Sequence, residues 1–90
     1  MRSDVNVEGL VLRIVSVLVD EPNKVDVKSV ITEKGTVFQV TVASTDVGKV
    51  IGKSGRTASS LRILLSAMGV ALKTRYGLDI AAARIQSYPG

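Results

Sequence analysis

Two residue types that carry much of enzyme chemistry are missing from this 90-residue chain, which has no cysteine and no histidine. Their absence excludes disulfides, thiol chemistry, imidazole general bases and the usual zinc ligand sets. With most catalytic options removed, we expect a protein that is not an enzyme and that has no catalytic residue, no metal site and no cofactor.

Long apolar segments are missing as well. The apolar run from Leu10 to Val19 is interrupted by Arg13 and Ser16 and has no small-residue cleavage site, so it does not resemble a signal peptide. It is also too short to cross a bilayer. These features predict a cytoplasmic protein that does not interact with a membrane.

Acidic residues are scarce in the second half of the chain. Residues 1–46 carry five Lys or Arg and seven Asp or Glu, whereas residues 47–90 carry seven and one. No acidic residue lies between Val47 and Leu78, a stretch that contains Lys49, Lys53, Arg56, Arg62, Lys73 and Arg75. This concentration of positive charge indicates a polyanionic partner, although charges that only solvate helix surfaces give the same pattern.

The composition, 46% hydrophobic and 22% charged, is that of a globular protein. The chain is long enough for one hydrophobic core and too short for a typical nucleotide hydrolase with its several layers. We therefore expect one domain over residues 1–90.

Hydrophobic spacing predicts a helix near the start of the chain. Ser3 or Asp4 is its expected cap, and residues 20–23 stop it. Its apolar positions recur every three or four residues, as a helix requires: Val7, Leu10, Val11, Ile14, Val17 and Leu18.

A β-hairpin is predicted next. The first strand covers Val25–Thr32, and one of its faces carries Val25, Val27 and Ile31. Residues 33–35 form the turn, with Gly35 at the position that needs a positive φ. The returning strand covers Thr36–Ala43, and one of its faces carries Phe38, Val40 and Val42.

Two helices follow. Residues 44–46 are capping residues for a short helix over Val47–Ile51, and a longer helix covers Arg56–Tyr76 until Gly77 ends it. Gly69 marks a close packing contact. The buried stripe of the long helix is Ala58, Leu61, Leu64, Leu65, Met68 and Leu72. Nearer the solvent lie Arg56, Ser59, Ser60, Arg62, Lys73 and Arg75.

The C-terminal region, Leu78–Tyr88, allows two interpretations. Helix propensity favours a helix through the alanines at 81–83, whereas a third strand would complete the sheet and bury Ile80 or Ile85. We prefer the strand because a sheet of two strands is marginally stable. Residues 78–90 are therefore assigned to a final strand and a tail.

The stretch GKVIGKSG at 48–55 resembles a phosphate-binding P-loop but does not match it. A P-loop has four residues between its first glycine and the Gly-Lys-Ser/Thr, and here there are three. The required first glycine would stand at position 47, which is Val47. We reject a nucleotide-binding enzyme on this ground; Mg²⁺-dependent protection by ATP or GTP against heating would reopen the question.

The tetrapeptide Gly-Lys-Ser-Gly, residues 52–55, joins the two predicted helices. Its glycines allow a sharp turn and a close approach by a sugar-phosphate backbone, and the following helix N-terminus favours anions. Lys53 and Arg56 add positive charge, and Ser54 can donate a hydrogen bond to a phosphate oxygen. The simpler alternative is that these residues only cap a helix and form a turn.

Set between two helices, the residues VIGKSGR at 50–56 resemble the signature of K-homology (KH) domains. The longer string DVGKVIGKSGRTA at 46–58 resembles, more narrowly, the small bacterial single-KH proteins of the KhpA/YlqC type. The likeness extends from the first helix to about Ile85, while residues 75–90 depart from the charged, β-branched final strand of that type. It implies an α+β fold: a single type II KH domain with a three-stranded mixed sheet packed on three helices, in the order α-β-β-α-α-β.

By this resemblance, single-stranded RNA lies across a groove between the glycine loop with its helices and the edge strand, and the loop clamps about four nucleotides. The implied RNA-binding residues are Lys49, Val50, Ile51, Gly52, Lys53, Ser54, Gly55, Arg56 and Arg62. An apolar floor for the bases would come from Val47, Val50, Ile51, Ala58 and Leu61, of which the last two also suit the core. With only Phe38, Tyr76 and Tyr88 as aromatic residues, ring stacking cannot dominate, so low sequence specificity is expected.

Members of the resembled family act as RNA chaperones or post-transcriptional regulators. They pair with themselves or with a larger, multi-domain KH protein, so the resemblance implies a homodimer or such a heterodimer. Because one loop binds RNA weakly, linking two sites would raise the effective affinity. The alternative is a protein-interaction module in which the same loop and helix form the dimer interface.

Overall fold

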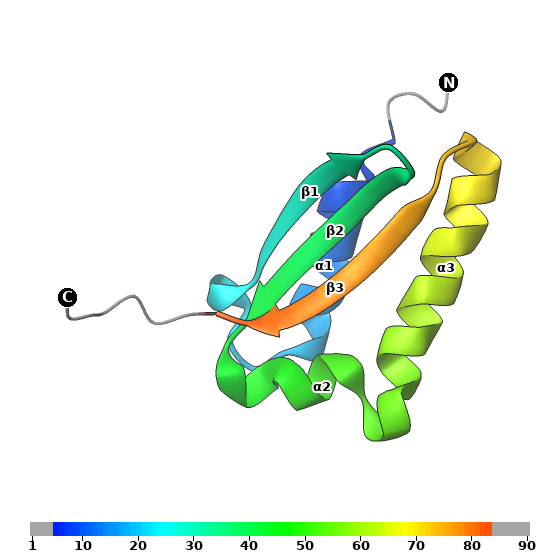
Figure 1. Ribbon diagram of the computed structural model, residues 1–90. Coiled ribbons are helices and arrows are strands. Elements are labelled where there is room, and N and C mark those ends of the chain that lie inside the picture. The colour runs from blue at the N-terminus through cyan, green and yellow to red at the C-terminus, as the bar shows by residue number, and fades with distance from the viewer. Residues whose placement is uncertain (1–4, 84–90) are drawn as a thin grey trace.

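The computed structural model describes residues 5–83, and Figure 1 shows their path. In this part of the chain three α-helices and three β-strands follow one another: α1 (Val7–Leu18), β1 (Asp26–Thr32), β2 (Gly35–Val42), α2 (Val47–Ile51), α3 (Arg56–Leu72) and β3 (Tyr76–Ala82). The predicted order α-β-β-α-α-β and the predicted α+β class are confirmed.

The strands form one mixed sheet in the order β1-β2-β3. β1 and β2 are antiparallel and joined by the predicted turn, after which Gly35 has the predicted positive φ, 143°. β3 lies parallel to β2, with Leu78 beside Phe38. Because a parallel pair needs a crossover connection, α2 and α3 form that crossover, and β3 is an edge strand beside α3 (Figure 1).

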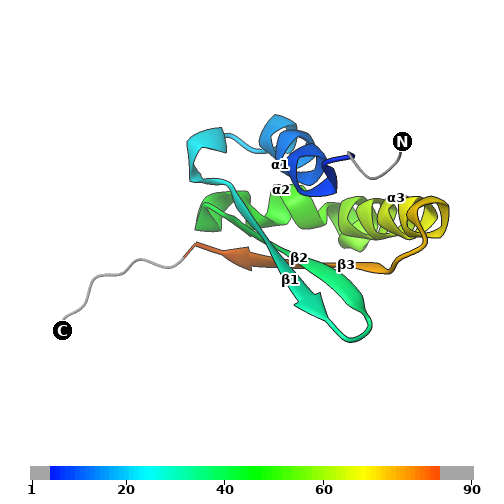
Figure 2. The same cartoon turned by 90° about the horizontal axis from the view of Figure 1, so that it is seen from above.

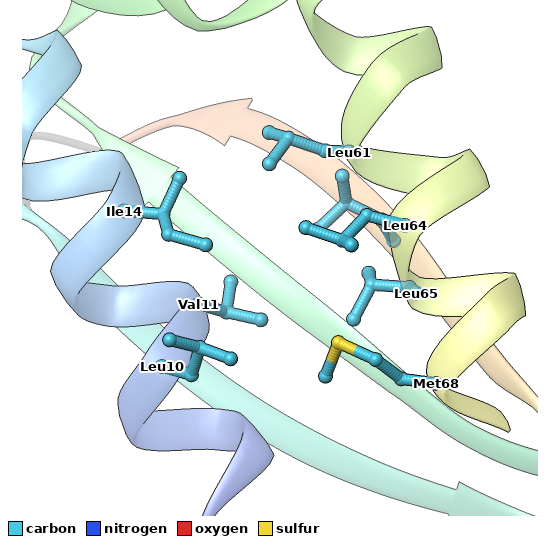
Figure 3. Close-up of a pocket in the computed structure, with 8 residues that line it drawn as sticks. Leu10, Val11, Ile14, Leu61, Leu64, Leu65 and Met68 are labelled. Carbon is cyan, nitrogen blue, oxygen red and sulfur yellow. The ribbon is translucent and has the colours of Figure 1, made fainter. Parts of the chain in front are cut away.

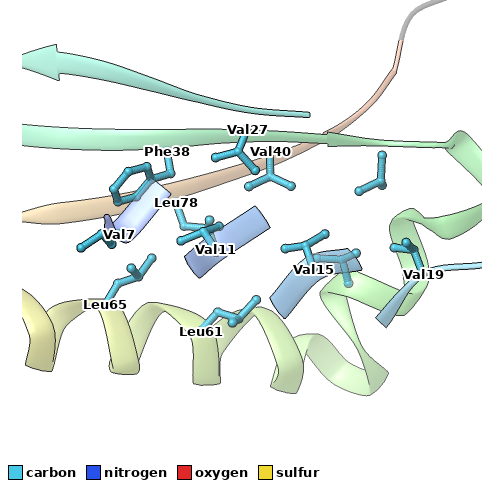
Figure 4. Close-up of a cluster of buried hydrophobic side chains, with 12 residues drawn as sticks. Val7, Val11, Val15, Val19, Val27, Phe38, Val40, Leu61, Leu65 and Leu78 are labelled. Carbon is cyan, nitrogen blue, oxygen red and sulfur yellow. The ribbon is translucent and has the colours of Figure 1, made fainter. Parts of the chain in front are cut away.

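The helices lie on one side of the sheet, as Figure 2 shows. The core fills the space between the two layers (Figure 4). The predicted inner face of β2 is confirmed, since its three apolar side chains are buried there: Phe38, Val40 and Val42. Burial of this continuous apolar layer is the main stabilising term of the fold.

The buried face of α1 differs from the predicted one. Val15 is completely buried, whereas Val17, which was expected in the stripe, is 84% exposed. The buried residues of α1 recur every four positions, at Val7, Val11 and Val15, and so lie on one face. Of the three residues predicted to share one face of the first strand, Val27 is buried, Val25 is partly buried, and Ile31, at the hairpin end, is 83% exposed.

The start of α1 also differs from the prediction. The helix begins after Asn6, whose side-chain oxygen accepts a hydrogen bond from the backbone N–H of Gly9 at 2.9 Å. This is the usual geometry of an N-cap. The assignment of the cap to Ser3 or Asp4 is therefore wrong, and both of these residues lie outside the described part of the chain.

α3 begins at Arg56, as predicted, but ends at Leu72 instead of Tyr76. Lys73 adopts a left-handed backbone conformation with φ 60°, and the N–H of Thr74 then bonds to the carbonyl oxygen of Gly69 at 2.9 Å. The buried stripe of α3 is largely as predicted: Ala58, Leu61 and Leu65 are buried, and Met68 and Leu72 partly so. Leu64 is the exception, at 46% exposed.

β3 confirms the preferred interpretation of the C-terminal region as a strand. It begins at Tyr76, so Gly77 lies within the strand and does not end α3. Leu78 is buried and Ile80 partly buried, while Ile85 lies outside the described residues. Between residues 5 and 83, no helix combines the length and the apolar character that a membrane span requires.

Candidate nucleic-acid interface

Gly52 ends α2 in a conformation that only glycine adopts readily. Its φ is 82° and its ψ is 169°, a region essentially reserved for glycine. A Cβ added here would clash with the side chain of Thr57 and lie 2.7 Å from the Thr57 backbone nitrogen. The N–H of Gly52 closes the last turn of α2 by bonding to the carbonyl oxygen of Gly48 at 2.9 Å.

The next residues complete a tight left-handed turn. Ser54 (φ 57°) and Gly55 (φ 73°) are both left-handed, and the N–H of Gly55 bonds to the carbonyl oxygen of Gly52 at 3.0 Å. Gly55 differs from Gly52 in its surroundings, because a Cβ added at Gly55 would have no neighbour within 4 Å. The first glycine is therefore required by crowding inside the loop, whereas the second leaves open space beside the N-terminus of α3.

The charges around this loop fall into two groups. Lys53 and Arg56 are exposed and form no ion pair within the described residues. Lys49 instead lies 3.3 Å from a carboxylate oxygen of Asp20 and 3.8 Å from one of Asp46. The freely available positive charge therefore lies at the start of α3, and the predicted site residue Lys49 is directed towards the end of α1.

Asp46 is a residue whose role the sequence did not reveal. It was expected to cap α2, but its side chain makes no capping bond. The side chain is instead completely buried. It accepts hydrogen bonds from the backbone N–H groups of Asp20 at 3.2 Å and Glu21 at 3.0 Å. It thus fastens the start of α2 to the chain after α1. An Asp before a short helix normally indicates an N-cap. The neighbouring sequence does not distinguish a cap from a buried acceptor that binds a distant backbone segment.

The apolar residues that were predicted for the site differ in their exposure to solvent. Val50 is completely buried, and Ala58 and Leu61 also belong to the core, so their side chains offer little surface to a ligand. Val47 is partly buried and packs against the same cluster. Ile51, at the end of α2 and next to Gly52, is exposed. An apolar contact with a ligand beside the loop is therefore limited to Ile51 and the outer part of Val47.

Arg62 lies in the second turn of α3 and reaches the edge strand. Its guanidinium Nη2 donates to the carbonyl oxygen of Leu78 at 3.1 Å, with Nε of the same group at 3.4 Å. This contact shows which side of α3 is turned towards β3. Arg62 remains exposed, so its charge lies on the surface between the helix and the strand, on the C-terminal side of the glycine loop.

Comparisons with known proteins agree with this architecture. A family model described as "KhpA/KhpB, KH domain" matches residues 8–80. A protein named RNA-binding protein KhpA from Treponema pallidum (strain Nichols) is 51% identical over 73 residues, which cover 81% of this chain and 91% of the relative. The protein of the same name from Bacillus subtilis (strain 168) is 36% identical over 78 residues, covering 87% of this chain and 96% of the relative. A third, from Borreliella burgdorferi, is 39% identical over 67 residues, covering 74% and 82%.

No solved structure matched the chain with significance. The family match nevertheless includes all of α2, the glycine loop and α3, together with most of α1 and β3. The geometry of the loop, the α-β-β-α-α-β order and these sequence matches agree, and the chain belongs to the KhpA/KhpB family of KH domains.

Proposed function

We propose that this protein binds single-stranded RNA through the glycine loop, residues 52–55, and the first turn of α3. The observation that carries the proposal is the open space at Gly55, flanked by the unpaired cations Lys53 and Arg56. A sugar-phosphate backbone can lie against a loop that has no side chain at this point, as in other KH domains. The relatives named RNA-binding protein KhpA support this proposal.

Low sequence specificity is part of the proposal. Phe38 is buried in the core, and the Tyr76 ring packs on it with the ring centroids 5.3 Å apart. Within residues 5–83 these are the only aromatic side chains, so none stands beside the glycine loop to stack on a base. Recognition there is left to phosphate contacts, which carry no base information.

We infer a non-enzymatic, cytoplasmic role as an RNA chaperone or post-transcriptional regulator. About three phosphate contacts give a salt slope of only about −2 for a single strand. Such a site exchanges RNA rapidly and suits a protein that rearranges or presents RNA. Residues Lys49 and Arg62 would add charge at the margins of the site, Lys49 less so because Asp20 and Asp46 already pair with it.

The test measures affinity for a fluorescent RNA of about thirty nucleotides at two salt concentrations. Lys53→Glu should weaken binding about tenfold at low salt and make the salt slope shallower by about 0.7. Lys28→Glu is the matched control, since it makes the same charge change on the strand β1. If both variants bind like the wild type, or both lose affinity equally, the loop is not the RNA site.

A second candidate function, pairing with another protein, is favoured by a different surface. Apolar residues of α1 and α3 line a crevice between the two helices (Figure 3): Leu10, Val11, Ile14, Leu61, Leu64, Leu65 and Met68. Leu78 of β3 completes the lining. Leu10 and Leu64 are exposed there, as is the neighbouring Ile63. We propose that this crevice receives a second copy of the chain, or the equivalent surface of a larger KH protein.

This surface is distinct from the glycine loop. The alternative drawn from the sequence placed RNA binding and dimerisation on the same loop and helix. On α3, Leu64 and Met68 line the crevice towards α1, whereas Arg62 reaches β3 on the other side. A dimer through the crevice would leave both glycine loops free, so the two functions can operate together and raise the effective RNA affinity.

A further inference from the structure

A hollow lies at the end of α3 that is farthest from the glycine loop. Its volume is ≈ 400 Å³, and it is lined by Ser66 and Val70 of α3 and by Thr74, Arg75 and Tyr76 of the following chain. This volume falls in the range of about 300–1,000 Å³ that is typical of small-ligand sites. The residues so far assigned to RNA binding do not include any of its lining.

The hollow lies on the same side of α3 as Arg62. Residues 62, 66 and 70 are spaced by four, so they follow one another along one face of the helix. The hydrogen bond from Arg62 to the carbonyl oxygen of Leu78 shows that this face borders the edge strand. An RNA strand that leaves the glycine loop and passes Arg62 would therefore reach the hollow along the same side of α3.

Backbone hydrogen bonds fix the chain that forms the far wall. The N–H of Thr74 bonds to the carbonyl oxygen of Gly69 at 2.9 Å, and the N–H of Thr36 bonds to the carbonyl oxygen of Arg75 at 2.8 Å. These bonds hold residues 74 and 75 against both α3 and the start of β2. The Arg75 side chain is thus exposed on a fixed piece of backbone at the edge of the hollow.

Positive charge surrounds the hollow. Arg75 also lines a neighbouring hollow of ≈ 200 Å³ together with Lys34 of the hairpin turn, and Lys73 lies two residues away in the chain. All three side chains are exposed, and none forms an ion pair within residues 5–83. Free cations beside a partly polar hollow can bind a phosphate group. The hydroxyls of Ser66 and Thr74 can form hydrogen bonds with the attached sugar and base.

We propose that this hollow is a second nucleotide subsite, in which Arg75 and Lys73 hold a phosphate and the residues of the hollow receive the attached nucleoside of the same RNA strand. The proposal rests on RNA binding at the glycine loop. α3 has 17 residues and is therefore about 25 Å long. At about 3.4 Å per stacked nucleotide, roughly seven nucleotides separate the two subsites, and fewer in an extended strand.

The separation makes the proposal testable by RNA length. An RNA of about three nucleotides is too short to join the two subsites even when it is extended, whereas one of about fourteen spans both. Arg75→Glu should weaken binding of the long RNA at least fivefold and binding of the short RNA less than twofold. Ser66→Leu, which fills the hollow without a charge change, should weaken the long RNA selectively as well. Arg13→Glu, on α1, is the matched charge control and should affect both RNAs equally and slightly.

The outcomes separate the two proposals. Lys53→Glu should weaken both RNAs, and if it weakens neither, RNA binding at the glycine loop is wrong. If Lys53→Glu weakens both while Arg75→Glu and Ser66→Leu leave the preference for the long RNA unchanged, the second subsite is overturned and the loop site stands. Equal losses for Arg75→Glu and Arg13→Glu on both RNAs would likewise overturn it, since they would indicate only general electrostatic attraction.

Discussion

The buried carboxylate of Asp46 accepts a hydrogen bond from the backbone N–H of Glu21, at 3.0 Å, across 25 positions of the chain. A second bond from Asp20 at 3.2 Å makes the attachment bidentate. α2 has only five residues, too few for a helix to be stable by itself. Asp46 therefore holds α2, and with it the start of the glycine loop, against the end of α1.

The first prediction is that Asp46→Asn lowers the free energy of unfolding by about 1–3 kcal/mol, because an amide presents N–H groups to one of the two backbone donors. Urea denaturation of the variant and the wild type measures this difference. Asp79→Asn is the control, since Asp79 is exposed on β3, and its effect should stay within about 0.5 kcal/mol. A loss for Asp46→Asn no greater than that of the control would refute the attachment.

The second prediction contrasts the two glycines of the loop. Gly52→Ala combines an unfavourable φ and ψ with a clash against Thr57, so it should destabilise the protein by more than about 2 kcal/mol. Gly55→Ala should cost only about 1–2 kcal/mol for its left-handed conformation. Thermal and urea unfolding test the order, and a smaller loss for Gly52→Ala than for Gly55→Ala would contradict the crowding found at Gly52.

The third prediction concerns RNA binding at Gly55. Gly55→Ala places a methyl group in the open space beside Lys53 and Arg56, so it should weaken RNA binding at a temperature where the variant is still fully folded. Gly48→Ala is the matched control, because it adds the same methyl group at an open position of α2. Fluorescence anisotropy with the long RNA measures both. Unchanged affinity for Gly55→Ala would mean that no RNA backbone approaches the loop there.

Much of the sheet could be predicted because alternation is a local property of the sequence. Phe38, Val40 and Val42 are apolar at every second position, and all three are buried on the face of the sheet that the helices cover (Figure 2). The helix faces were harder to predict. Val15 and Val17 are both valines in one apolar helix, and only the position of α1 over the sheet decides that the first is buried and the second exposed.

The end of α3 and the contacts of two predicted site residues could not be predicted for a different reason. α3 ends because Lys73, not a glycine, takes the left-handed conformation, and a lysine gives no local sign of this. Lys49 and Arg62 were both assigned to RNA from charge and resemblance. Their partners, Asp20 and the carbonyl oxygen of Leu78, are 29 and 16 positions away, so only the folded chain shows that one cation is paired and the other borders the edge strand.

The fourth prediction tests the crevice between α1 and α3. Leu64 is exposed at its rim, so Leu64→Asp should leave the monomer folded while a charge in the apolar contact disfavours pairing. Mass measurement in solution should show a dimer for the wild type and a monomer for the variant. Ile31→Asp, at the hairpin end, is the control and should remain dimeric. A wild type that is monomeric at high concentration, or a Leu64→Asp dimer, would remove the crevice as a self-association surface.

The last prediction compares two glycines that both lie within helices, Gly48 in α2 and Gly69 in α3. Replacing a helical glycine with alanine gains up to about 1 kcal/mol from helix propensity alone. Gly48 has open space around its Cα, so Gly48→Ala should stabilise the protein. At Gly69 the added Cβ would lie 2.6 Å from the carbonyl oxygen of Thr74, within the turn that ends α3. Gly69→Ala should therefore destabilise the protein, although alanine has a higher helix propensity than glycine.

The opposite signs are the decisive feature, because propensity predicts the same sign for both positions. Urea unfolding of the two variants gives the comparison directly. The clash at Gly69 also acts on the backbone that carries Arg75, since the Thr74 N–H bonds to the Gly69 carbonyl oxygen at 2.9 Å. Gly69→Ala should consequently weaken the binding of long RNA more than that of short RNA. If Gly69→Ala stabilises the protein as Gly48→Ala does, the close contact between α3 and its following turn is not a constraint on the chain.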